Sequence, residues 1–426
     1  MKNEQDPFHL HLDLQSDSPE PDGATPKGAQ ATVGPTLAAK YEGAEHAWLG
    51  LHGAEAACAG DPVKLKMLLE LSRPNDQAVL NYGEIVALSG DFYRTPEELF
   101  LQKPARLPWW KGSNDLATLR KAFASELTWI EDAHHTKGYP DNTITFAWTA
   151  KSYLELAEDN TAHFGWHNLK KYCENHALAI QFALQAKSQT STDENWMRAM
   201  FFNGFADHFL TDGFAAGHIR VPRQQIREWA PTRGYDGKLA GFLSKVLHDQ
   251  DGHVAHFHDQ GEDPLDANEG LPVRNSLGDD WSTRCDGQLF LVKRGATDPL
   301  LLQPVTAVKE SLLEVFAAQE QQRTPDGVYR ALQHVPFPHP NAPSLSQKFA
   351  DTSPERIKDL LESFAWYTEL PFIDASLNQD NIKALFEALP QLMQKFGEAV
   401  AAEYAASEEL RRRLPEPYVN AFKNIR

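Results

Sequence analysis

The chain has 426 residues, 42% of them hydrophobic, and a formal net charge of −18 at pH 7. This length suffices to bury a sizeable core, as one large domain with an appendage or as two domains. The negative charge argues against a broad nucleic-acid surface or anchoring to anionic lipid, because both require a basic face. Three cysteines without CxxC spacing predict neither a disulfide framework nor a thiolate metal site.

Residues 1–38 are predicted to form a flexible leader, because they are polar, acidic and proline-bearing (QSDSPEPDGATPKG). They lack the basic start and apolar stretch of a secretory signal. No apolar run in the chain reaches about 18 residues, so no transmembrane helix is expected.

From about Ala39 to Leu247 the pattern predicts helices, with apolar residues spaced three and four apart in LAAKYEGAEHAWLGLHGAEAA, VKLKMLLELS and DLATLRKAFASELTWIEDA. His46 shares the first of these helices with His52. It is a candidate metal ligand, and an ordinary core or surface histidine is the alternative. Asp91 follows a helix at a Ser-Gly break and precedes Phe92 and Tyr93. It is a second candidate, with a simple turn residue as the alternative.

Two further features precede the central motif. His163 and His167 lie one helical turn apart with aromatic residues between them, which fits metal ligation or aromatic packing. Ser191 with Glu194 predicts a capping box at the start of the next helix.

The segment ADHFLTDGFAAGHIRVPR carries the pattern HxxxDxxxxxH through His208, Asp212 and His218. His208 and Asp212 lie one helical turn apart, so one face offers an imidazole and a carboxylate to a cation such as zinc. An ordinary buried His-Asp pair is the alternative. His218 would lie roughly 120° around a continuous helix from Asp212. It would serve a neighbouring metal, or the helix would open at Gly213 or Gly217 and re-aim it.

Beyond Leu247 the helical pattern ends. His248 opens HDQDGHVAHFH, a dense group of histidines and aspartates that fits metal ligation or a solvated helix end. Residues 259–300 are rich in Asp, Gly and Pro, and QLFLVK is the one strand-like run there. Helix resumes near Leu301. Ser353-Pro354-Glu355 predicts a helix start, and the last fifty residues predict a helical hairpin.

Together these motifs resemble the zinc-dependent phospholipases C of bacteria, whose fold is shared with the fungal zinc single-strand nucleases. FADHFLTDGFAAGHIRVPR, NYGEIVALSGDFY and KVLHDQDG resemble a phosphatidylcholine-preferring branch, over roughly residues 40–255. The resemblance implies an all-α, multi-helix bundle with a catalytic domain at 39–258. Residues 259–426 would form a C-terminal extension with some β structure and a helical hairpin.

The resemblance also implies up to three zinc ions. Asp91, His163, His208 and Asp212 would hold one, and Asp212 would bridge to a second held partly by His46. His218 and His248 would hold a third with a following acid. The family places that acid where this chain has Gly252, so Asp251 is chosen, with Asp249 in reserve. The family also uses the amino-terminal residue of the mature chain as a ligand. Here 45 residues precede His46, so the leader is cleaved, or the second site is completed differently or left empty.

The activity implied is hydrolysis of phosphatidylcholine-type phospholipids to diacylglycerol and phosphocholine. Asp91 would act as general base or water orienter, and Phe92 would help enclose choline unless it is a core residue. A zwitterionic phospholipid and a transiently contacted membrane surface are the expected partners. The alternatives are a zinc single-strand nuclease or nucleotidase, and a helical effector with a structural metal site. A bacterial cytoplasmic protein, or one exported without a secretory signal, is expected.

Overall fold

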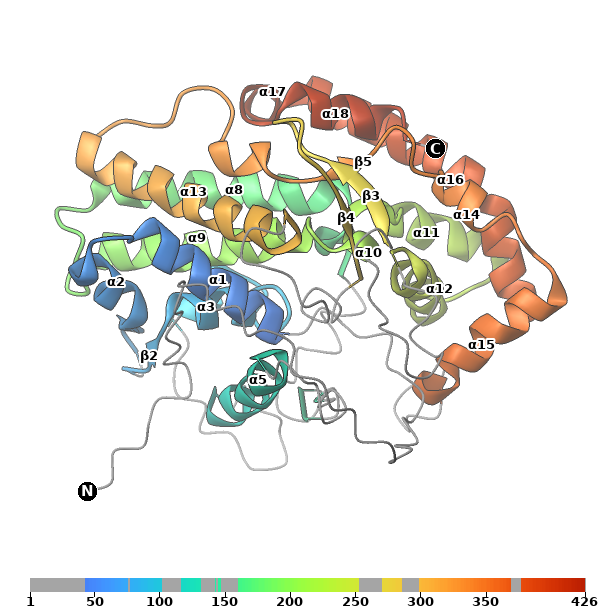
Figure 1. The fold of residues 1–426 in the computed structure, drawn as a ribbon, viewed down its shortest axis with the longest axis horizontal. Helices are drawn as coiled ribbons and strands as arrows, with labels where there is room; N and C mark the ends of the chain where they lie inside the picture. Colours follow the sequence, from blue (N-terminus) through green and yellow to red (C-terminus); the bar gives the residue numbers. More distant parts are fainter. Residues whose placement is uncertain are drawn as a thin grey trace, which may run out of the picture.

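The computed structural model describes residues 43–75, 77–101, 116–131, 142, 145–146, 160–252, 270–285, 299–368 and 377–425. The predicted leader and the QLFLVK run lie outside the described residues. The described chain is mainly helical, as predicted (Figure 1). Its membership of the zinc phospholipase C and nuclease fold stays a prediction.

The centre of the molecule is a layer of helices around α9 (Glu194–Asp212), which packs against α8 (Trp166–Gln185), α3 (Tyr82–Leu88) and α13 (Pro299–Gln321). α1 (Gly43–Ala57) lies beside α3 and α13 (Figure 1). α9 is buried on almost every side from Trp196 onward, including its polar residues. A helix enclosed in this way places any polar side chain it carries in the protein interior.

Shorter helices and the C-terminal helices surround this layer. They are α2 (Pro62–Leu69), α4 (Pro96–Leu101), α5 (Leu116–Glu131), α10 (Ala216–Arg220), α11 (Arg223–Trp229), α12 (Gly237–Gln250), α14 (Leu345–Lys348), α15 (Pro354–Thr368), α16 (Gln379–Ala406), α17 (Glu408–Arg413) and α18 (Glu416–Lys423). Three 3-10 turns join them: η1 (Asn160–His163), η2 (Ala230–Arg233) and η4 (Arg330–Gln333).

Two small sheets complete the described fold. β1 (Leu71–Ser72) pairs antiparallel with β2 (Val79–Leu80), and the second sheet has the order β4-β3-β5. Its strands are β3 (Leu271–Arg274), β4 (Asp280–Thr283) and β5 (Phe337–Pro338), all antiparallel. The two longest of these strands fall in LPVR and DWST, which the sequence alone does not identify, because runs of four residues or fewer carry little periodic signal.

The helix starts test the capping predictions. α15 begins at Pro354, as predicted. The predicted capping box of Ser191 and Glu194 is wrong: Asp193 is the N-cap of α9, and its carboxylate accepts from the backbone N–H groups of Asn195 and Trp196. The carboxylate also accepts from two backbone N–H groups of the preceding loop. These four bonds fix the helix start two residues later than predicted.

One hydrophobic core runs through helices from both ends of the chain, from Ala44 on α1 to Phe422 on α18. The predicted domain boundary at 258/259 falls within the undescribed segment 253–269. The described residues on its two sides share this core. α18 packs back on α16, where the Lys423 carbonyl lies against Gly397, so the C-terminal hairpin is present.

A buried polar network joins α9 to α3 and α13. Both oxygens of the Asp207 carboxylate accept hydrogen bonds at 2.6 Å, from the hydroxyls of Tyr82 on α3 and Ser311 on α13. The Asn203 amide also donates to Asp207, at 3.2 Å. Burial raises the pKa of the Asp207 carboxyl to about 7, although the bonds from Ser311 and Tyr82 oppose this. The network continues to α8 and further along α13 through His176 and Glu314.

None of the helices within the described residues is long and apolar enough to cross a membrane.

Candidate metal centre

The C-terminal end of α9 presents the two central residues of the HxxxDxxxxxH motif. His208 and Asp212 lie one turn apart and are buried. α9 ends at Asp212 with Gly213 as its C-cap, and α10 begins at Ala216. The predicted opening of the helix therefore occurs at Gly213. It brings Nδ1 of His218 to 3.5 Å from the Asp212 Oδ1 atom.

Strand β4 and the residue that follows it hold this opening in place. The Thr283 hydroxyl donates to the Phe214 carbonyl, and the Ala216 N–H donates to the Arg284 carbonyl at 2.8 Å. The turn that re-aims His218 is thus fixed by residues of the C-terminal part of the chain.

His163, on η1, closes a three-ligand group with the two residues of α9. Its Nδ1 atom lies 2.9 Å from Asp212 Oδ2 and 3.2 Å from His208 Nε2. His208 Nε2 lies 3.9 Å from the same Asp212 oxygen. The ligating atoms of His163, His208 and Asp212 lie within 4.8 Å of one another and could hold a metal ion.

A second group combines His46 and Asp91 with His208, again with ligating atoms within 4.8 Å of one another. The His46 ring lies 4.1 Å from the His208 ring, and its Nε2 atom lies 3.5 Å from Asp212 Oδ1. Asp91 is partly exposed, whereas the histidines and Asp212 are buried. Because both groups contain His208, the structure gathers His46, Asp91, His163, His208 and Asp212 into one cluster.

Gly90 leaves the space that this cluster needs. Its φ is +71°, a conformation that favours glycine. A Cβ atom there would lie 2.5 Å from His208 Nε2 and 2.8 Å from His163 Cε1. The Ser-Gly break identified the turn in the sequence, but the contact with both histidines is visible only in the structure.

Backbone carbonyls orient two of the imidazoles. His208 Nδ1 lies 3.0 Å from the Val86 carbonyl oxygen, and His218 Nδ1 lies 2.7 Å from that of His163. A carbonyl oxygen only accepts, so each Nδ1 carries the proton and donates it. The lone pair needed for metal binding is therefore on Nε2 in both residues.

The electrostatics favour neutral imidazoles. Burial lowers the pKa of His46 and His208 well below the usual value, and the neighbouring histidines lower both further. A metal binds the neutral form of histidine. The donor set of neutral imidazoles around the carboxylate of Asp212 therefore fits a divalent cation.

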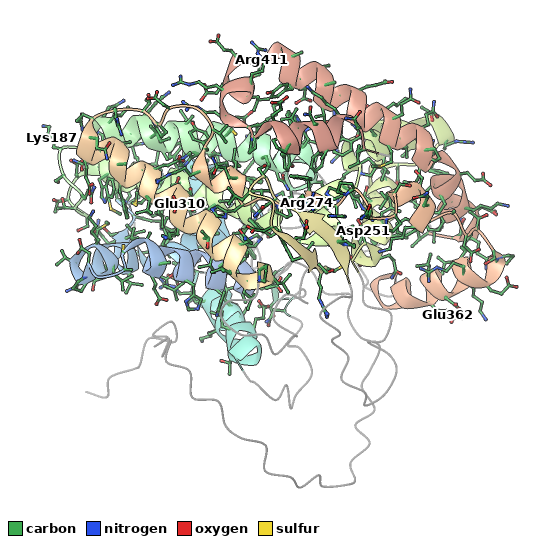
Figure 2. All side chains as sticks on the ribbon, turned by 45° about the horizontal axis from the view of Figure 1, so that its top comes forward. Lys187, Asp251, Arg274, Glu310, Glu362 and Arg411 are labelled. Atoms are coloured by element: carbon green, nitrogen blue, oxygen red, sulfur yellow. The ribbon has the colours of Figure 1, made fainter. Side chains whose placement is uncertain are left out.

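His248 and the acids after it form a different arrangement. The His248 ring lies 4.8 Å from the His218 ring, and its Nδ1 atom lies 2.7 Å from the Asp249 carboxylate. Asp251 is instead in a buried bidentate ion pair with Arg220, at 2.7 and 2.8 Å. Asp251, labelled in Figure 2, is fully buried. Ligation of a third zinc by Asp251 stays a prediction.

The positive charges around Asp251 explain why its carboxylate pairs with Arg220. Burial alone would raise the pKa of this carboxyl, but Arg220 and Lys348 hold it below the usual value. Among the described residues, neither His218 nor His248 belongs to a group of three side chains able to share a metal ion.

Phe92 lies in the interior. It is 1% exposed, and its ring packs edge-on against Phe123 and Phe146 at 5.7 and 5.2 Å. This is the core packing named as the alternative, and a choline contact for Phe92 stays a prediction. The neighbouring Tyr93 hydroxyl accepts from the Arg73 guanidinium at 3.3 Å.

Thr211 is a site residue that the sequence analysis missed. Its hydroxyl lies 2.7 Å from His46 Nδ1. A hydroxyl one residue before the motif aspartate, inside an apolar helix, was the available signal.

Comparison of the chain with known protein families, with curated proteins and with solved structures finds no match. The geometry of the cluster is therefore the basis on which its function is argued.

Proposed function

We propose that this protein is a zinc-dependent phosphodiesterase that hydrolyses phosphatidylcholine-type phospholipids to diacylglycerol and phosphocholine. The observation that carries the proposal is the gathering of His46, Asp91, His163, His208 and Asp212 into two ligand groups that share His208. These residues come from four separate segments of the chain. Ordinary packing has no need to bring three histidines and two carboxylates together, because polar and charged groups are costly to remove from water.

The donor set supports zinc as the metal. Zinc takes imidazole nitrogen and carboxylate oxygen readily, and catalytic zinc sites commonly combine the two. His163, His208 and Asp212 would hold one ion, with Asp91 beside them, and His46 would hold a second across Asp212. When bound, zinc supplies positive charge to the oxygens of a phosphodiester and lowers the pKa of water to about 7.

The residues of the chain have distinct parts in this proposal. Asp91 is the partly exposed member of the cluster, so a phosphodiester and its attacking water would meet the cluster on the Asp91 side. Its carboxylate is placed to take the proton of that water. Asp212 and the imidazoles around it are buried and would keep bulk water away from the opposite side.

The lipid substrate rests on the resemblance of the central motifs and on the charge of the chain. A net charge of −18 disfavours a single-stranded nucleic acid, which is bound through a basic groove. A zwitterionic head group does not require a basic groove. The same cluster would also serve a nuclease, so the choice between the two substrates is made by experiment.

The first test measures phosphocholine release from phosphatidylcholine vesicles by the full chain, with added zinc and with a chelator. We expect release that depends on zinc. Asp212→Asn keeps the shape of the side chain and removes its charge. It should lower the rate by more than about 100-fold, because even the outer partners of metal ligands are worth about 10- to 100-fold.

Asp326→Asn is the matched control for this variant, because Asp326 is 91% exposed and far from the cluster in sequence. Wild-type rates in Asp212→Asn would contradict the proposal. Zinc binding without lipid hydrolysis, but with cleavage of single-stranded nucleic acid, would favour the nuclease. Tight zinc without any hydrolysis would favour a structural metal site.

A further inference from the structure

A side-chain hydrogen bond joins Thr211 on α9 to His46 on α1 at the candidate metal centre. Its Oγ1 atom lies 2.7 Å from His46 Nδ1, and both residues are buried. Thr211 stands on α9 directly before Asp212, whereas His46 comes from α1. The bond therefore joins two elements that each supply a ligand to the cluster.

The direction of this bond follows from the other partners of the hydroxyl. Thr211 Oγ1 lies 2.8 Å from the Asp207 carbonyl oxygen and 2.9 Å from that of His208. Carbonyl oxygens only accept, so the single hydroxyl proton is directed at them. The hydroxyl oxygen then accepts from His46, which places the imidazole proton on Nδ1. The His46 Nε2 lone pair is left facing Asp212 Oδ1, 3.5 Å away.

We propose that Thr211 is a positioning residue, which fixes the orientation and tautomer of His46 so that Nε2 is available to a metal ion. The proposal rests on the metal centre of the proposed function and is independent of the substrate. His208 and His218 are oriented by backbone carbonyls, which no substitution removes. For His46 the same task falls to a side chain, so it can be tested directly.

The test compares Thr211→Val and Thr211→Ser in the full-length protein. Valine keeps the shape of threonine but has no acceptor, and serine keeps the hydroxyl. Zinc affinity is measured by competition with a chromophoric chelator. We expect valine to weaken zinc binding by about 10- to 100-fold, as for other outer partners of metal-binding histidines. Serine should restore most of the loss.

A second readout does not need the metal. Nitrogen-15 NMR of the zinc-free protein reports which ring nitrogen of His46 carries the proton, and His46→Gln identifies its signals. We expect protonation at Nδ1 in the wild type and in Thr211→Ser. In Thr211→Val the proton should move to Nε2 or be shared between the two nitrogens.

The outcomes separate this proposal from the proposed function. If wild-type protein binds no zinc, the proposed function fails, and NMR still decides the role of Thr211. Unchanged zinc affinity and an unchanged tautomer in Thr211→Val would overturn the proposal. If circular dichroism shows Thr211→Val to be unfolded, the smaller Thr211→Ala takes its place. Unfolding of both, with Thr211→Ser folded, would assign Thr211 to the stability of α9 and also overturn the proposal.

Discussion

Histidines from separate parts of the chain surround the carboxylate of Asp212. Nitrogen atoms of His46, His163, His208 and His218 all lie within 4 Å of it, at 3.5, 2.9, 3.9 and 3.5 Å. A carboxylate in the protein interior requires compensating charge. Burial keeps the pKa of His46 and His208 low, so both rings are neutral, and their N–H groups donate to Thr211 and to the Val86 carbonyl rather than to Asp212. A bound cation would supply that charge.

Gly90→Ala tests whether the space at the cluster is needed for metal binding. The added Cβ would lie 2.5 Å from His208 Nε2, where the metal-binding lone pair is. We expect zinc affinity to fall by about tenfold or more, by analogy with the loss of an outer partner of a metal ligand. The measurement is zinc competition with a chelator.

Gly234→Ala is the control for backbone strain. Gly234 also has a positive φ, +76°, but a Cβ atom there would meet nothing within 4 Å. Both substitutions place alanine in a left-handed conformation, which costs on the order of 1 kcal/mol of stability. Equal zinc affinity in the two variants would show that the space beside His208 is not required.

The individual residues of the site were predictable to different degrees. His208 and Asp212 follow from their spacing on one helix, whereas the glycines of the motif leave open whether and where the helix breaks, and the structure breaks it at Gly213. The hydrogen bond of Thr211 to His46 depends on α1 packing beside α9, which no local sequence pattern predicts. The ion pair of Asp251 depends on Arg220, which the fold brings close.

At the scale of elements, α9 lies at the centre of the described helices, and its polar residues have two different sets of partners. His208 and Asp212 face the metal centre, while Asp207 faces the hydroxyls of α3 and α13. The helical periods predicted α1, α2, α5 and most of α9 because amphipathic or buried helices leave a repeated pattern. The start of α9 was misplaced because Ser191 and Asp193 both fit the capping rule, and backbone N–H groups of the preceding loop donate to Asp193 and select it.

The Asp207 carboxyl should make stability depend on pH. Its pKa is raised to about 7 in the folded protein, whereas an unfolded aspartate has a pKa of about 3.9. The folded state therefore binds more protons than the unfolded state between these values. The Asp207 contribution to stability is present in full below about pH 4 and is lost as the pH rises through about 7.

Asp207→Asn should make the stability of the protein less dependent on pH between about pH 4 and pH 7. The measurement is urea unfolding of the zinc-free protein between pH 4.5 and 7.5, compared with the wild type and with Asp326→Asn. The control aspartate is exposed. A wild-type profile in Asp207→Asn would show that this carboxyl does not titrate with a raised pKa.

At the scale of the whole molecule, the C-terminal part of the chain supports the candidate metal centre. β4 fixes the turn before His218, and Ser311 on α13 binds Asp207. Gly165 lies two residues after His163, and a Cβ atom there would meet the Phe396 side chain of α16. Residues after 270 therefore contact the segments that carry the ligands. From sequence alone these residues look like an extension, because their partners are distant in sequence.

The Arg220–Asp251 ion pair is one of these supports. Arg220 also donates to the Pro343 carbonyl, and Lys348 on α14 donates to Asp251. Arg220→Leu would leave a buried carboxylate without its main partner. We expect a loss of about 3–5 kcal/mol in the free energy of unfolding, measured by urea denaturation.

Arg220→Leu combined with Asp251→Leu is the matched comparison. Replacing both charges removes the uncompensated carboxylate, so the double variant should be more stable than Arg220→Leu alone. Equal stability of the two variants would show that the Asp251 charge is not the cause of the loss.

The hydrogen bond from Ser311 to Asp207 spans 104 residues and bears on when the metal centre can form during synthesis. Every candidate ligand up to Asp251 leaves the ribosome before α13 and α16 have been made. Contacts of such long sequence separation form late in folding, because a long loop must first be closed. A nascent chain would thus carry the ligands before it has the scaffold that aligns them. If the protein cleaves phospholipids, this order of assembly would delay the activity until translation of the chain is nearly complete.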